Sequence, residues 1–148
     1  GSEFQELYLS GLSGQLDLDL DLEANLQRMC RRAISEGLLN SAHDCSEGGL
    51  GVALAESCIV GGFGFLGEFT WQGRWDAAIF GEGQSRIIVS VSQEKLSKVE
   101  ELAKGESVPI CILGRVGKDR FKIPSFCDLP IDSLRQAWEN GLAQALSS

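Results

Sequence analysis

The stretch SAHDCSEGGL, residues 41–50, decides the fold, because an extended segment must turn into a helix within it. The apolar pair Leu38 and Leu39 leads into it as a strand entry, and the mostly apolar residues 50–59 after it predict a helix. Ser46 is expected to cap that helix. The glycine pair at 48 and 49 lets the backbone come close to a bound group, which the first free N–H groups of the helix would face.

This strand–turn–helix geometry suits an anion such as a phosphate, held by Ser46, Gly48 and Gly49. Asp44, just before the turn, is the matching candidate to hold a divalent cation such as Mg²⁺ that the phosphate also binds. A structural interpretation stays open, because a glycine pair behind a helix cap also makes an ordinary tight turn. His43, the only histidine, has the same two interpretations: a catalytic group or a hydrogen-bonded structural side chain.

The composition narrows the classes of partner. The 148 residues carry a net charge of −8 and a pI near 4.6, which disfavours nucleic acid and anionic membranes. The one basic cluster, Arg28, Arg31 and Arg32, has acidic neighbours and is interpreted as a solvated helix face. The five cysteines form no C-x-x-C pair, which is typical of a reducing compartment. We expect a cytoplasmic protein, with an organelle as the alternative.

The order of predicted elements indicates the α+β class with helices packed on a mixed sheet. Residues 1–15 are expected to link a preceding domain to one domain over residues 16–148. Within that domain the sequence predicts helices and strands at these positions: helices over 22–36, 50–59, 93–104 and 130–146, a helical turn over 76–80, and strands over 63–70, 87–91, 108–116 and 120–123, the last two as a hairpin.

Residues 16–23 alternate strictly between apolar and acidic side chains. The pattern predicts a half-buried extended segment, with Asp21 capping the helix that follows. Its D-x-D-x-D spacing also invites a calcium loop. That alternative is disfavoured, because such a loop needs glycine at its sixth position and glutamate at its twelfth, where this chain has Leu22 and Arg28.

Two stretches carry a resemblance to a known family: AHDCSEGGLGVALAE at 42–56 and FGEGQSRIIVSV at 80–91. They resemble the C-terminal module of phosphoribosylformylglycinamidine synthase (FGAM synthase), a module shared with aminoimidazole ribonucleotide synthase. The resemblance covers almost the whole chain and implies a layered α/β sandwich with a mixed sheet. The opening residues 1–4 are similar to a motif ahead of that module, although the same four residues would also fit a cloning scar.

The resemblance implies an ATP-dependent C–N ligase of purine biosynthesis. ATP would activate the amide oxygen of formylglycinamide ribonucleotide, ammonia from glutamine would displace the phosphate, and Mg²⁺ would neutralise charge. It also implies Asp44 as a magnesium ligand and Ser46 as a nucleotide contact.

A second candidate site follows from the stretch at 80–91. The resemblance implies that Glu82 and Gln84 face the substrate, with Arg86 beside them, although Gly83 replaces a commoner polar residue. The alternative is that Arg86 and Glu82 only pair with each other.

The expected partners are preceding synthase domains of the same chain and a glutaminase domain or subunit that supplies ammonia. The site would then lie in a cleft between domains, so the isolated fragment is expected to be inactive. The competing hypothesis is a non-catalytic module that holds a structural nucleotide or forms a subunit interface.

Overall fold

The structure of the chain is a computed structural model that describes residues 18–71 and 73–146. The chain divides into two compact units: Gly1–Ala53 with Arg74–Cys111, and Leu54–Gly73 with Ile112–Ser148. The predicted linker over residues 1–15 lies outside the described residues, so the domain boundary at residue 16 stays a prediction.

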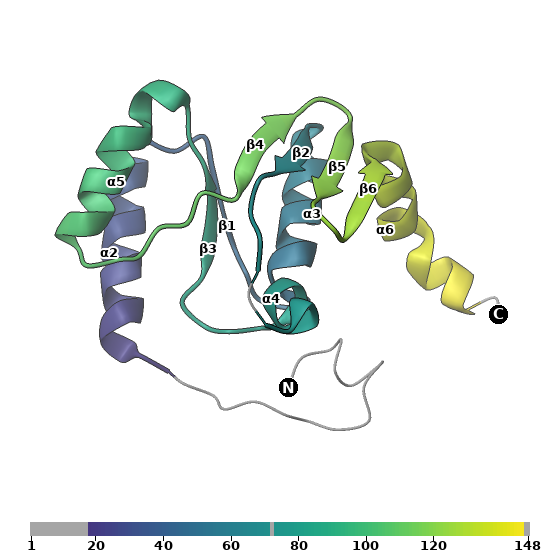
Figure 1. The fold of residues 1–148 in the computed structure, drawn as a ribbon, viewed down its shortest axis with the longest axis horizontal. Coiled ribbons are helices and arrows are strands. Elements are labelled where there is room, and N and C mark those ends of the chain that lie inside the picture. The colour runs from purple at the N-terminus through teal and green to yellow at the C-terminus, as the bar shows by residue number, and fades with distance from the viewer. Residues whose placement is uncertain (1–17, 72, 147–148) are drawn as a thin grey trace. The chain divides into compact units, whose positions relative to one another are not determined.

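Two helices lying side by side build the core of the first unit: α2 (Leu20–Ser35) and α5 (Leu96–Gly105) (Figure 1). The first turn of α2 is capped by Asp19, whose carboxylate accepts the N–H of Leu22 at 2.9 Å, so the expected cap at Asp21 was wrong. Apolar side chains recur at helical spacing on both helices and meet in one buried cluster. Its members are Leu26, Met29, Ala33, Leu38, Val99, Leu102, Ala103 and Val108.

A two-stranded antiparallel sheet completes the frame of this unit. It pairs β1 (Ser41–Asp44) with β3 (Ile87–Ser90), and Asp44 lies opposite Ile87. Helix α3 (Gly49–Gly61) follows β1, and the short α4 (Trp75–Phe80) leads toward β3. A 3-10 turn, η1 (Gln93–Lys95), opens α5. The strand–turn–helix predicted around residues 41–50 is therefore confirmed.

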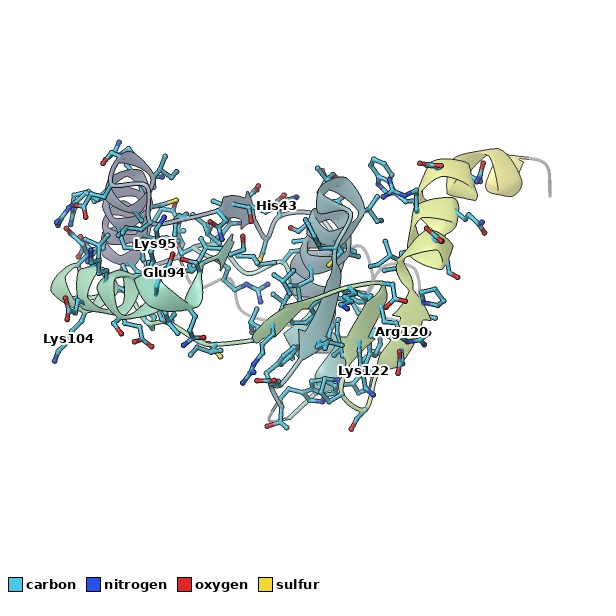
Figure 2. The ribbon with its side chains drawn as sticks, turned by 90° about the horizontal axis from the view of Figure 1, so that it is seen from above. His43, Glu94, Lys95, Lys104, Arg120 and Lys122 are labelled. Atoms are coloured by element: carbon cyan, nitrogen blue, oxygen red, sulfur yellow. The ribbon has the colours of Figure 1, made fainter. Side chains whose placement is uncertain are left out.

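The second unit contains a four-stranded mixed sheet in the order β4-β2-β5-β6. Its strands are β2 (Gly64–Gly67), β4 (Gly114–Gly117), β5 (Arg120–Ile123) and β6 (Cys127–Pro130). The alternating pattern buries Phe65 and Phe121 on one face and leaves Arg120, Lys122 and Asp128 on the other, where they form ion pairs (Figure 2).

The predicted hairpin between residues 108–116 and 120–123 was wrong. Strand β4 covers only Gly114–Gly117, and it pairs with β2, which lies between β4 and β5. The two residues between β4 and β5, Lys118 and Asp119, instead pass over the start of β2. There the N–H of Gly64 donates to the carbonyl of Lys118 at 3.0 Å. A Cβ on Gly64 would come within 2.3 Å of the carbonyl oxygen of Arg120, so glycine permits this crossing.

The last helix, α6 (Ile131–Leu146), begins one residue later than predicted, because Pro130 ends β6. Ile131 is buried, but Trp138 is 57% exposed, so Trp138 is not the core residue that its spacing predicts. Arg135 donates to the carbonyl of Ile59 at 2.8 Å and thereby holds α6 to the end of α3. Among residues 18–71 and 73–146, no helix combines the length and apolar composition needed to cross a membrane.

Candidate functional site

The pairing of β1 with β3 brings the two candidate stretches together within the first unit. Asp44, the last residue of β1, lies opposite Ile87, the first residue of β3. The backbone contact continues one step further, because the N–H of Cys45 donates to the carbonyl of Arg86 at 3.0 Å. The turn at 45–48 and the loop at 81–86 therefore start from the same end of one strand pair.

The turn itself depends on its two glycines. Gly48 and Gly49 have φ angles of +75° and +67°, in the left-handed region that glycine adopts without strain. A Cβ on Gly49 would lie 2.7 Å from the carbonyl oxygen of Gly81, so the turn and the loop are packed backbone to backbone. Helix α3 begins at Gly49, so Ser46 lies within the turn, and its carbonyl accepts the N–H of Gly49 at 3.2 Å.

The N–H of Gly48 donates to a carboxylate of the protein itself, the Oε1 of Glu82, at 3.1 Å. A negative group is favoured at this point, because the first N–H groups of a helix lack partners within it and carry partial positive charge. The anion that the glycine turn was expected to attract is thus, in this structure, a side chain of the neighbouring loop. This contact joins the two stretches that were identified separately in the sequence.

Arg86 stabilises the loop from inside. Its guanidinium donates to the carbonyl oxygens of Gly81 and Gly83, the latter at 3.3 Å. These contacts fix the backbone on both sides of Glu82 and give Arg86 a structural role. Gln84, at the tip of the same loop, is exposed.

Two residues that matter for this loop were not identified from sequence. Ser85 has a φ of +59°, a conformation that costs energy for a residue with a side chain. Its hydroxyl donates to the Oε2 of Glu23, on the first turn of α2, at 2.6 Å. Glu23 ends the alternating stretch 16–23, but it is 62 residues from Ser85 in the sequence, so no local pattern could reveal this contact.

The polar residues at the end of β1 differ in exposure. His43, labelled in Figure 2, lies in β1. Its Nδ1 lies 2.7 Å from the carbonyl oxygen of Asp44, and its side chain is 35% exposed. The side chain of Asp44 is 74% exposed, and Ser46 is exposed as well. Both are therefore accessible to a ligand from solvent, while His43 is partly held by its backbone contact.

The donors available for a metal are few. Within the part of the chain that the structure describes, no group of three or more His, Cys, Asp or Glu side chains has the arrangement of a metal site. Asp44 alone would contribute one carboxylate, which suits Mg²⁺ because this ion commonly combines one or two protein carboxylates with water and substrate phosphates. Burial raises the pKa of the Cys45 thiol, so this neighbouring cysteine is not an activated nucleophile.

Comparison with known proteins gives one matching family and a consistent set of relatives. Residues 2–124 match the family described as AIR synthase related protein, C-terminal domain. The chain is 44% identical, over 86% of its length, to the phosphoribosylformylglycinamidine synthase subunit PurL of Thermomicrobium roseum. It is 36% identical, over its whole length, to the PurL subunit of Synechocystis. The chain spans about a fifth of the length of these relatives, 18% and 20% respectively.

Solved structures show the same fold. Thermotoga maritima PurL complexed with ATP superposes with a TM-score of 0.68 at 22% identity, over 80% of this chain and 22% of that one. The PurLQS structure from the same organism gives a TM-score of 0.68 at 22% identity, over 88% of this chain and 24% of that one. These likenesses confirm the predicted α+β class with a mixed sheet.

Proposed function

The chain belongs to the AIR synthase related protein C-terminal domain family, and on that premise we propose that it is the C-terminal domain of a phosphoribosylformylglycinamidine synthase. In this role it would act in purine biosynthesis as part of a longer protein, since the relatives are about five times its length. The reaction proposed for the intact protein is the ATP-dependent conversion of formylglycinamide ribonucleotide to its amidine. The proposed source of ammonia is a glutaminase domain or subunit.

One observation carries the assignment of the site: the contact between the Gly48 N–H and the Glu82 carboxylate. It unites the two stretches that resemble the family and places them at one end of the β1–β3 pair. We propose that this end, with His43 and Asp44 on β1, Ser46 on the turn and Glu82 and Gln84 on the loop, faces a cleft completed by other domains of the intact synthase.

The proposed division of roles follows from exposure. Asp44 and Ser46 are exposed, so they are available to a magnesium-nucleotide ligand, with Asp44 for the cation and Ser46 for a phosphate oxygen. When bound, the cation would neutralise charge on the phosphates. The chain itself would hold and orient these groups, because Gly48 and Gly49 fix the direction of the first turn of α3.

A second candidate function has a specific observation in its favour. Because Glu82 already accepts the N–H of Gly48, the glycine turn has an internal anionic partner and does not need a phosphate for stability. The chain would then be a non-catalytic module of the same parent, with a structural nucleotide or a subunit interface elsewhere.

The experiment that tests the proposal compares the intact parent with the isolated chain. With ATP, Mg²⁺, ammonia and formylglycinamide ribonucleotide, we expect the intact parent to form the amidine and the 148-residue chain to form none. The isolated chain should still show a cooperative melt by circular dichroism. Absence of amidine formation by the intact parent would contradict the synthase assignment, and activity of the isolated chain would contradict a site shared between domains.

A further inference from the structure

The loop at 81–86 has no regular secondary structure, so side-chain contacts hold its shape. Glu82, Ser85 and Arg86 each make such contacts. Glu82 accepts the N–H of Gly48, Arg86 binds two carbonyls within the loop, and Ser85 donates to Glu23. The last of these contacts anchors the loop to helix α2.

Two features indicate that the Ser85–Glu23 contact constrains the loop. The hydrogen bond is short, at 2.6 Å, as expected when a hydroxyl donates to an ionised carboxylate. Ser85 also has a φ of +59°, which surrounding contacts must stabilise in a residue that carries a side chain. Loss of the hydrogen bond from Ser85 to Glu23 would remove one of the contacts that stabilise this backbone conformation, so the loop could adopt another one.

Glu23 is itself held in place by its own helix. Its Oε1 accepts from the Nε2 of Gln27, one turn further along α2, at 2.8 Å, while Oε2 accepts from Ser85. These two hydrogen bonds lower the pKa of the Glu23 carboxyl, that from Ser85 more strongly, so the side chain is ionised at neutral pH. The chain Gln27–Glu23–Ser85 therefore connects a packed helix to the loop.

We propose that Glu23 is a positioning residue of the candidate site: through Ser85 it fixes loop 81–86 in the conformation that places the Glu82 carboxylate on the N–H of Gly48. The inference deepens the proposed function and rests on it for the identity of the ligand that the loop faces. The contact between Glu23 and the loop can be tested without any ligand.

The first measurement is amide hydrogen exchange of Gly48 in the full 148-residue chain, followed by NMR. Glu23→Ala and Ser85→Ala should each accelerate exchange about three- to tenfold, the range expected for losing one hydrogen bond. The double variant should exchange no faster than either single variant, because both remove the same contact.

Conservative variants provide the rescue. Glu23→Gln retains an oxygen that accepts from Ser85, and Ser85→Asn retains a donor on a residue that tolerates positive φ, so both should restore slow exchange. Glu100→Ala, which removes an exposed carboxylate from α5, is the matched control and should leave Gly48 unchanged. Unchanged exchange of Gly48 in Glu23→Ala would overturn the proposal, as would equal acceleration at the amides of α5.

The second measurement concerns the intact synthase. Glu23→Ala should raise the KM for formylglycinamide ribonucleotide several-fold with a smaller change in kcat, and Glu23→Gln should restore it. A faster Gly48 exchange with an unchanged KM would support the role of Glu23 and overturn the assignment of the loop to substrate. Failure of the positioning role of Glu23 is thus distinguishable from failure of the proposed function.

Discussion

At the scale of single residues, the sequence identified the candidate site through its motifs and missed the contacts that shape it. His43, Asp44, Ser46 and the glycine pair are recognisable because a strand, a glycine turn and the helix that follows leave local signals. The partner of Gly48 could not be predicted in the same way, because Glu82 is 34 residues away and reaches it only when β1 and β3 pair.

Substitution of His43 tests whether this residue has a catalytic or a structural role. We expect His43→Ala in the intact synthase to lower turnover at least about 100-fold, the size typical of lost acid–base catalysis, with a small change in melting temperature. His43→Asn serves as the comparison, because its amide can still donate to the Asp44 carbonyl that lies 2.7 Å from Nδ1. Full turnover with a large loss of stability would show that His43 only supports the fold.

At the scale of helices and strands, amphipathic segments were predictable and the sheet connections were not. The helices α2 and α5 bury the side chains that their periodicity selects, because those side chains face one another. The strand order was not predictable, since β2 inserts between two strands that only two residues separate in sequence. Residues 108–113 have an apolar pattern but form no strand in this structure.

The contact between α2 and α5 should depend on pH. Glu106, at the end of α5, accepts from Arg32 at 3.0 Å and from Arg28 at 3.3 Å, and these hydrogen bonds, that of Arg32 first, lower its pKa. Because the folded pKa lies below the unfolded value of about 4.3, the stabilisation is present above that pH and disappears as the pH falls through the folded value.

Glu106→Gln should therefore lower the melting temperature at pH 7, and the difference from wild type should shrink steadily as the pH is lowered below about 4. Glu36→Gln is the control, because Glu36 pairs with Arg32 at 3.5 Å with both side chains at least half exposed. Thermal melts of the three proteins across this pH range provide the test. A Glu106→Gln effect that is equally large at pH 3 would exclude the ion pair as its cause.

The crossing of the chain over β2 predicts a strict requirement for glycine. Gly64→Ala should destabilise the second unit by about 1–3 kcal/mol, because its Cβ would meet the backbone oxygen of Arg120. Gly141→Ala is the matched control, because a Cβ added at Gly141 would have no described atom within 4 Å and alanine is the better helix former. Denaturant unfolding should separate the two variants, and a fully stable Gly64→Ala protein would contradict the described crossing.

At the scale of the whole molecule, the fold class followed from the sequence because the helical and extended patterns are distinct along the chain. The site could be predicted only in part, because the chain spans about a fifth of the length of its relatives and the proposed cleft would include residues of other domains. Asp44, for example, would supply one carboxylate to a magnesium ion. The other ligands of that ion would have to come from phosphates, water and further domains.

The most direct test of the account is calorimetry of nucleotide binding to the intact synthase with Asp44→Asn, Ser46→Ala and the double variant. We expect Asp44→Asn to weaken binding about tenfold or more in magnesium buffer and much less without magnesium, because it removes the charge that would hold the cation. Ser46→Ala should weaken binding in both buffers, and the two losses should be coupled. Strictly additive losses, or an Asp44→Asn effect independent of magnesium, would mean that Asp44 and the turn at 45–48 only determine the fold.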